Sequence, residues 1–270
     1  MKRVTDFMRF RAEGQPISMV TCYDAWSARL IVDSTIDAVL VGDSVAMVMH
    51  GYSSTVHATR EMMATHTAAV RRGIGEHFVV ADFPFPEHRK GIPAAMETAD
   101  LLMKAGANAV KIEGAEGHLE VIRHLVGSGV PVMGHLGLTP QSVNQFGGYR
   151  VQGREEAAAR QLGLDALALQ EAGIFSLVLE CIPAELAARI TESLTIPTIG
   201  IGSGAACSGQ ILVLQDVLGF NSGFHPKFLR TYADGARVVR DGLEAFNSDV
   251  KEGRYPSPSE SFDYGAVGQH

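Results

Sequence analysis

The stretch Ala109-Val-Lys-Ile-Glu-Gly114 indicates the fold, because a short apolar run ends there in charged residues and a glycine. Such a run is typical of a buried β-strand that leads into a loop. The segment before it, Pro93–Ala105, carries strong helix formers with recurring apolar positions, and Gly106 can adopt the left-handed conformation that ends a helix. The sequence therefore predicts a helix followed by a strand.

This alternation of strands and helices continues along the whole chain. Eight runs are expected as strands: Ile17–Asp24, Ala38–Ser44, Phe78–Pro84, Ala109–Gly114, Val130–Gly137, Ser176–Pro183, Pro197–Gly204 and Ile211–Leu218. Helices are expected between them at Thr59–Arg72, Pro93–Ala105, His118–Gly127, Glu155–Ala172 and Pro183–Leu194. Eight apolar strands need cover on both faces, and closing them into a barrel inside a ring of helices leaves no free edge.

The predicted fold class is therefore α/β, as a single (β/α)8 TIM barrel. An extra N-terminal helix, Val4–Ala12, is expected to cover the lower end of the barrel. The chain of 270 residues has the size of one such domain, which we place at residues 1–255. Residues 256–270, which begin Pro-Ser-Pro-Ser, are expected to form an extended or disordered tail.

Composition excludes several classes of partner. Hydrophobic residues make up 46% of the chain, which is enough for a large core, and the formal charge of −7 does not favour binding to nucleic acid. No apolar run approaches the roughly 18 residues of a membrane span, and no signal peptide is apparent, so we expect no membrane association and a cytoplasmic location. The spacing of Cys22, Cys181 and Cys207 fits neither disulfides nor a zinc site, so we expect reduced thiols.

Polar residues end several of the predicted strands, and catalytic groups of such barrels lie at the C-terminal ends of strands. A period of two places Asp43 on one face with Val39 and Val41, and it likewise places Asp82 with Phe78 and Val80. The fourth strand directs Lys111 and Glu113 to one face, and His135 and Glu180 end the next two strands. One pocket is thus expected to hold four acids, one lysine and one histidine.

Four carboxylates in one mouth repel one another unless a cation compensates them. Oxygen ligands without a matching set of Cys and His favour a hard ion, and a site with few protein ligands suits Mg²⁺. We expect Asp43 and Asp82 to bind the metal directly and Glu113 to hold a metal-bound water.

Simpler structural roles remain open at this stage. A single Asp after a strand is commonly a helix cap or a turn residue. Lys111 and Glu113 could form an interior salt bridge, and His135 could donate to a backbone carbonyl. The glycine-rich run Ile199–Gly204 could cradle phosphate, or it could simply allow close packing. Repetition of charged residues at equivalent ends of several strands favours a functional site.

These residues lie in motifs that resemble the ketopantoate hydroxymethyltransferases, relatives of the phosphoenolpyruvate/pyruvate barrel enzymes that include isocitrate lyase. The resemblance runs from Thr21 to Phe228. The motifs are Val41-Gly-Asp-Ser44, Ala81-Asp-Phe-Pro84, Val110-Lys-Ile-Glu-Gly114, Gly134–Ser142, Phe146-Gly-Gly-Tyr149, Val151-Gln-Gly153, Leu179-Glu180 and Ile199-Gly-Ile-Gly202. The chain departs from the family pattern at Ala46, at Pro86–His88 and at Ala205–Ser208.

The resemblance implies that a hydroxymethyl group passes from 5,10-methylenetetrahydrofolate to 3-methyl-2-oxobutanoate through a Mg²⁺-stabilised enolate. The product would be 2-dehydropantoate, in the first step of pantothenate biosynthesis. It further implies that Asp43, Asp82 and Glu113 hold Mg²⁺, that Ser44 and Lys111 bind the keto acid, and that Glu180 is the base. His135 is expected to orient the substrate or relay protons. A homo-oligomer, in the form of a decamer, is also implied.

Two other functions are alternatives to this one. A carbon–carbon lyase of the same superfamily would run the enolate chemistry in the cleaving direction, but the Lys-Lys-Cys-Gly-His motif of those enzymes is absent from the sequence. A non-catalytic metabolite-binding barrel would be expected to have lost part of the acid set, which is complete here.

Overall fold

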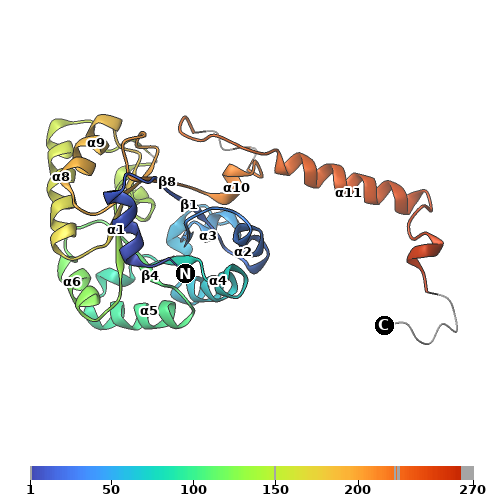
Figure 1. The fold of residues 1–270 in the computed structure, drawn as a ribbon, viewed down its shortest axis with the longest axis horizontal. Coiled ribbons are helices and arrows are strands. Elements are labelled where there is room, and N and C mark those ends of the chain that lie inside the picture. Colours follow the sequence, from blue (N-terminus) through green and yellow to red (C-terminus); the bar gives the residue numbers. More distant parts are fainter. Residues whose placement is uncertain (1, 149, 222, 224–225, 263–270) are drawn as a thin grey trace. The chain divides into compact units, whose positions relative to one another are not determined.

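Eight parallel strands close into a barrel in the computed structural model, which describes residues 2–148, 150–221, 223 and 226–262 (Figure 1). The strands are β1 Ile17–Thr21, β2 Ala38–Val41, β3 Phe78–Asp82, β4 Ala109–Glu113, β5 Val132–Gly137, β6 Ser176–Glu180, β7 Thr198–Ile201 and β8 Gly209–Leu212. Each strand pairs with the next along the chain, and β8 pairs with β1. The predicted fold class is confirmed.

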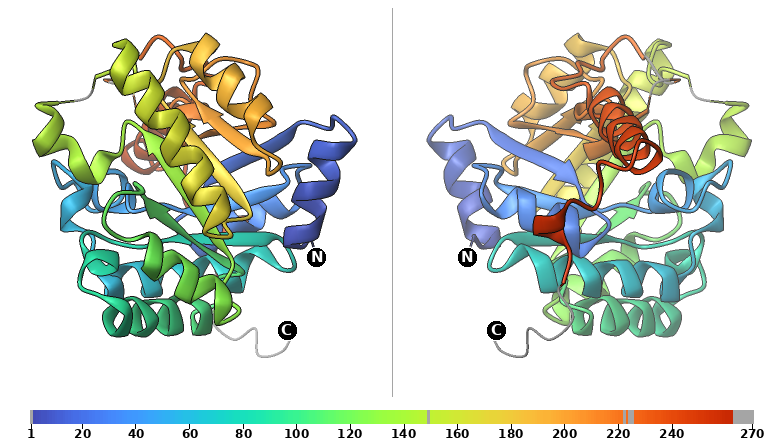
Figure 2. Two further views of the ribbon diagram at one scale, coloured as in Figure 1. Left: turned by 90° about the vertical axis from the view of Figure 1, so that its left-hand side faces the viewer. Right: turned by 90° about the vertical axis from the view of Figure 1, so that its right-hand side faces the viewer.

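Helices surround the strands and cover their outer faces (Figure 2). Among the longer helices, those around the barrel are α2 Ala25–Val32, α4 Arg60–Ile74, α5 Ile92–Lys104, α6 Leu119–Gly127, α8 Glu156–Glu171 and α9 Ala184–Ser193. The other longer helices of the chain are α1 Val4–Ala12, before the first strand, and α11 Gly235–Lys251, after the last strand. Short helical turns are α3 Val45–Val48, η1 Thr55–His57, η2 Glu87–Arg89, η3 Pro140–Ser142, α7 Val143–Phe146, α10 Leu214–Val217 and η4 Pro258–Glu260. Of the longer helices, α2 and α11 were not predicted.

Two apolar layers result from the alternation of side chains along each strand. One layer packs between the strands and the helices and contains Val79, Val110 and Ile112. The other fills the barrel interior with alternate residues such as Val80 and Ala109. Burial of both strand faces explains why the strands read as nearly continuous apolar runs in the sequence.

The N-terminal helix closes the lower end of the barrel, as predicted. Phe7 of α1 is fully buried and belongs to the interior cluster. Its ring centroid lies 5.1 Å from that of Phe78, at the start of β3, and 5.4 Å from that of Phe175, just before β6. Aromatic contacts of this kind stabilise beyond their buried area. Figure 1 shows α1 in blue lying across the end of the ring.

Most predicted strands begin where the structure places them but run too far into the following loops. The largest error is at the eighth strand, which is Gly209–Leu212 rather than Ile211–Leu218. Leu214–Val217 forms a helical turn instead. The start was missed because Gly209 and Gln210 carry no β-strand signal, although Gly209 fits closely against Ile17 of β1.

The predicted side-chain direction on the second strand is wrong. Val39 and Val41 face the helices, and Leu40 faces the barrel interior. Asp43 still reaches the mouth because β2 ends at Val41 and the chain then turns, which breaks the period of two. On β3 the prediction is correct, since Phe78 and Val80 both point inward.

Backbone contacts group residues 1–214 into one compact unit, which holds the barrel, and residues 215–270 into another. The proposed boundary at residue 255 stays a prediction. Within the expected tail, Pro258–Glu260 forms a single 3-10 turn, and residues 263–270 lie outside the described part of the chain, as does Tyr149 of the resemblance motif. Across the described residues, each helix is too short or too polar to cross a membrane.

Candidate active site at the barrel mouth

A cavity of about 120 Å³ opens at the C-terminal ends of the strands, here called the mouth. Its lining includes all seven side chains that the sequence singled out: Asp43, Ser44, Asp82, Lys111, Glu113, His135 and Glu180. Five of them, all except Ser44 and Glu180, are almost completely buried. The barrel thus gathers residues from five successive strands or the turns that follow them.

Asp43 and Asp82 lie side by side on neighbouring strand ends. The backbone N–H of Asp43 donates to Asp82 Oδ2 over 2.9 Å, so the turn after β2 is held against the end of β3. Burial, together with the charges of Asp82 and Glu113, raises the pKa of Asp43 well above its usual range. Burial also raises the pKa of Asp82, although the nearby Lys111 ammonium offsets part of this effect.

Lys111 and Glu113 share the inner face of β4. Lys111 Nζ lies 2.7 Å from Asp82 Oδ1 and 3.5 Å from Glu113 Oε1, so the interior salt bridge that the sequence left open exists as part of a larger cluster. Burial disfavours the charged form of Lys111, but the carboxylates of Asp43, Asp82 and Glu113 have a larger, opposite effect. The pKa of Lys111 is therefore raised above its ordinary value. Burial likewise opposes ionisation of Glu113, yet Lys111 and His135 lower its pKa to about 2.

His135 links Glu113 to Glu180. Its Nδ1 lies 3.2 Å from Glu113 Oε1 and also 3.2 Å from Lys111 Nζ, and its Nε2 lies 3.2 Å from Glu180 Oε2. The contact with Glu180 is an ion-pair contact rather than a well-aligned hydrogen bond. Burial and the charge of Lys111 favour the neutral form of His135, but Glu113 and Glu180 favour the charged form more strongly. The net effect raises the pKa of His135 to about 9.

Two of the protonation states open to His135 place a proton on Nε2. If the ring is neutral and Nδ1 accepts from Lys111, the proton must be on Nε2. If the ring is an imidazolium, both nitrogens carry protons. In both states the Nε2 proton faces Glu180. The alternative that His135 serves only as a donor to a backbone carbonyl does not match its neighbours.

The residue after Glu180 is held in a strained conformation. Cys181 has φ +48°, the only positive value among the described non-glycine residues. Its N–H donates to Ile201 O and its carbonyl accepts from Gln152 N, each over 2.9 Å. Such outliers cluster at functional sites, where surrounding contacts compensate the strain.

The described cysteines are all free thiols, as expected.

Two residues that support the site were missed from the sequence. Gln141 in η3 donates from Nε2 to Asp43 Oδ2 over 2.9 Å, and its backbone N–H donates to Glu113 Oε2 over 3.1 Å. Tyr23, fully buried in the loop after β1, lies with its hydroxyl 2.8 Å from Ser44 Oγ. Gln141 belongs to the motif Gly134–Ser142 quoted above, but neither residue ends a strand, so the rule used to select site residues did not include them.

The side chains present fit a hard divalent cation. Asp43, Asp82 and Glu113 bring three carboxylates to one buried place, where burial, with the neighbouring carboxylates, raises the pKa of both aspartates and so disfavours their charged forms. Among the described residues, no three His, Cys, Asp or Glu side chains already enclose a metal position. An ion with few direct protein ligands that retains several waters matches this arrangement, and Mg²⁺ is such an ion.

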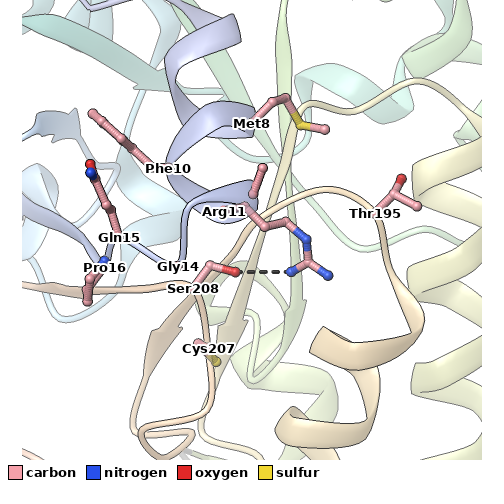
Figure 3. Close-up of a pocket in the computed structure, with 10 residues that line it drawn as sticks. Met8, Phe10, Arg11, Gly14, Gln15, Pro16, Thr195, Cys207 and Ser208 are labelled. Atoms are coloured by element: carbon pink, nitrogen blue, oxygen red, sulfur yellow. Dashed lines mark hydrogen bonds between the residues drawn. The ribbon is translucent and has the colours of Figure 1, made fainter.

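A larger cavity, of about 470 Å³, lies at the other end of the barrel beside α1 (Figure 3). Arg11 is the only charged residue among the described residues that line it. Its guanidinium donates to Ser208 Oγ over 3.1 Å and also to the carbonyl oxygens of Thr191 and Leu194. These three acceptors engage the guanidinium within the protein, so the role of Arg11 is to tie α1 to the end of α9. The mouth, which gathers the charged side chains, is therefore the better candidate for an active site.

The glycine-rich run after β7 is explained by packing. A Cβ on Gly204 would lie 2.6 Å from the Ala184 side chain, at the start of α9. Ser203 Oγ donates to Leu179 O over 2.8 Å and so ties the run to β6. The close approach favours the packing role over a phosphate cradle.

Comparison with known proteins identifies the relatives of the chain. A family model described as ketopantoate hydroxymethyltransferase matches residues 1–258. A protein of Bdellovibrio bacteriovorus named 3-methyl-2-oxobutanoate hydroxymethyltransferase is 56% identical over 262 residues, which cover 97% of this chain and all of the relative. A protein of the same name from Coxiella burnetii is 52% identical over 252 residues, or 93% of this chain and 95% of the relative.

Solved structures share the fold at low sequence identity. A 2,3-dimethylmalate lyase of the PEP mutase/isocitrate lyase superfamily is 16% identical with a TM-score of 0.58, covering 96% of this chain and 93% of that one. A phosphonopyruvate hydrolase in complex with oxalate and Mg²⁺ is 11% identical with a TM-score of 0.62, with the same coverage. These similarities support the barrel fold alone.

Proposed function

The chain belongs to the ketopantoate hydroxymethyltransferase family, and we propose that its mouth cavity transfers a hydroxymethyl group to 3-methyl-2-oxobutanoate, the first step of pantothenate synthesis. The proposed donor is 5,10-methylenetetrahydrofolate, and the product is 2-dehydropantoate. The observation that carries the proposal is the placement of Glu180 beside a buried cluster of one lysine and three carboxylates in a single cavity. Family membership favours this function over the lyase and the non-catalytic alternatives.

Lys111 and Ser44 are proposed to bind the carboxylate of the keto acid. Lys111 is charged and buried, so its ammonium group can attract an anion strongly in a site that excludes water. Ser44 follows the metal-ligand candidate Asp43 directly, and its hydroxyl is fixed by Tyr23. A carboxylate held between the two would leave the remainder of the substrate directed toward Glu180.

Asp43 and Asp82 are proposed to bind Mg²⁺ directly, with Glu113 acting through a water. When bound, Mg²⁺ supplies a Lewis acid that stabilises negative charge developing at the keto oxygen. Gln141 holds Asp43 and Glu113 in fixed positions through its two hydrogen bonds.

Glu180 is proposed to remove the proton from C3 of the keto acid. Its side chain is more exposed than its neighbours, with 18% of its surface accessible, so it can meet a substrate that enters the mouth. The Nε2–H of His135 faces its carboxylate and can hold it in one orientation as charge moves away from it. The carbanion equivalent at C3 then forms a bond to the one-carbon unit of the folate. Both C–N bonds of that unit break, water supplies the oxygen of the new hydroxymethyl group, and tetrahydrofolate leaves.

Assembly and location remain predictions from the sequence. We propose a homo-oligomer, for which light scattering of the purified protein is the direct measurement. The proposed location is the cytoplasm, and the proposed partners are the keto acid and the folate.

The test of the function is exchange of the C3 proton, followed by proton NMR of 3-methyl-2-oxobutanoate in D2O. We expect the C3 signal to disappear when protein and Mg²⁺ are both present, because enolisation needs no folate. Addition of 5,10-methylenetetrahydrofolate should then give 2-dehydropantoate. Persistence of the C3 signal in both experiments, with folded protein, would contradict the proposal.

A further inference from the structure

Thr55 lines the mouth cavity, although it lies in η1, well after the end of β2 along the chain. It is 3% exposed, and its hydroxyl has no hydrogen-bond partner among the described residues. A buried hydroxyl without a partner loses its bonds to water and gains nothing in return. An unpaired hydroxyl on the wall of a binding cavity therefore points to a partner in the bound ligand.

The other hydroxyl groups of the cavity wall are engaged within the protein. Ser44 Oγ is 2.8 Å from the Tyr23 hydroxyl, and Thr21 Oγ1 accepts from Leu214 N over 3.1 Å. Thr55 is the one hydroxyl among the described lining residues that lacks such a contact.

The backbone around Thr55 is fixed, so its hydroxyl occupies a defined place. Ser54 caps η1, its Oγ accepting from Val56 N over 3.2 Å, and the carbonyl of Thr55 accepts from Ala58 N over 2.9 Å. Ala58 is buried in the core, which anchors the far end of the turn. A hydroxyl held in this way is preorganised for ligand binding.

We propose that Thr55 is a further substrate-binding residue, whose hydroxyl hydrogen-bonds the oxygen of the hydroxymethyl group in the product. The proposal rests on the proposed function. The carboxylate and keto oxygens have partners in Lys111, Ser44 and the metal ligands. The hydroxymethyl oxygen is the polar atom that distinguishes the product from the keto acid, and no other residue has been assigned to it. Since a threonine hydroxyl both donates and accepts, it matches an alcohol.

The test compares the two ligands in Thr55→Val, which keeps the shape of the side chain and removes the hydroxyl. Affinities for 2-dehydropantoate and 3-methyl-2-oxobutanoate are measured by calorimetry with Mg²⁺, alongside the C3 exchange rate. We expect affinity for 2-dehydropantoate to fall roughly 3- to 10-fold, as for the loss of one neutral hydrogen bond. Affinity for the keto acid and C3 exchange should stay at wild-type values.

Two further variants separate binding from structure. Thr55→Ser restores the hydroxyl and should recover affinity for 2-dehydropantoate. Thr59→Val is the matched control, because the Thr59 hydroxyl caps α4 outside the cavity by accepting from Met62 N, and its removal should not alter the ratio of the two affinities.

The outcomes distinguish this inference from the proposed function. Equal losses for both ligands in Thr55→Val, or no loss for either, would overturn the role of Thr55 while wild-type C3 exchange still supports the function. If the wild-type protein neither exchanges C3 nor binds the keto acid, the proposed function itself fails.

Discussion

At the scale of single residues, Glu180 carries the most direct prediction. Glu180→Gln keeps the size of the side chain but cannot accept a proton. We expect C3 exchange and hydroxymethyl transfer to fall together, by roughly 100- to 10,000-fold, the usual effect of losing a positioned base. Binding of the keto acid should change little, because Lys111 and the metal ligands remain. Exchange and transfer rates are measured by NMR with wild-type protein beside the variant.

A near-normal exchange rate in folded Glu180→Gln would show that another group removes the proton. His135 is the nearest candidate, since its Nε2 lies 3.2 Å from Glu180.

Asp43 carries a second prediction at this scale, about the metal. Asp43→Asn removes one negative oxygen, while its amide oxygen can still accept from Gln141. We expect Mg²⁺ binding, measured by calorimetry in the presence of keto acid, to be lost together with metal-dependent activity. Burial and the neighbouring carboxylates raise the pKa of Asp43, so its negative charge destabilises the folded protein when no metal is bound. The metal-free Asp43→Asn variant should therefore have a free energy of unfolding no lower than that of the metal-free wild type. Unchanged Mg²⁺ affinity would rule out Asp43 as a ligand.

At the scale of elements, the short turns that follow the strands do more than connect them. η3 brings Gln141 to Asp43, and η1 brings Thr55 to the cavity. η2 buries His88 with neither ring nitrogen hydrogen-bonded among the described residues. The ring of His88 packs on that of His118, with 4.6 Å between centroids.

The buried η2 histidine predicts a loss of stability in acid. Burial, with His118 and Arg89, lowers the pKa of His88 to about 3, whereas an unfolded histidine titrates near 6.5. Below pH 6.5 the unfolded chain therefore binds the proton and the folded chain does not, so stability falls with pH down to about pH 3. Between pH 7 and pH 5 this should cost about 2 kcal/mol.

His88→Phe should remove this part of the pH dependence. The measurement is urea unfolding of wild type and variant at pH 7 and pH 5. His124, which is exposed, provides the control in His124→Gln. An equal acid-induced loss in wild type and His88→Phe would contradict the role assigned to His88.

At the scale of the whole molecule, closure of the barrel depends on the β1–β8 pair. Gly209 pairs with Ile17 there, and a Cβ on Gly209 would lie 2.3 Å from Ile17 O and 2.9 Å from Ile199 Cδ1. Gly209→Ala should therefore lower the free energy of unfolding by about 1–3 kcal/mol or more, as overpacking does. Gly163→Ala, in α8 with no atom near the added methyl group, should instead stabilise by about 0.5–1 kcal/mol.

Urea unfolding of both variants tests this difference in sign. A stabilising effect of both substitutions would mean that β1 and β8 do not pack as closely as the structure shows.

Much of the site could be predicted because it depends on local pattern. Asp82, Lys111 and Glu113 end apolar runs whose period of two survives to the last residue, so both their strand and their inward direction follow from the sequence. Asp43 was correctly placed at the mouth, but not for the reason given, which was a period of two shared with Val39 and Val41. β2 ends at Val41, and the turn that follows it, rather than the strand, brings Asp43 to the mouth. Gln141 and Thr55 lie on short turns with no such period.

By itself, the sequence determined the alternation of strands and helices, the barrel class and the set of charged groups at the strand ends, since each follows from residue type and spacing along the chain. Only the tertiary structure decided which groups touch. Gln141 meets Asp43 across 98 residues of sequence, and Gly209 meets Ile17 only when the barrel closes. These contacts depend on how distant segments pack, because burial and charge act through space rather than along the chain.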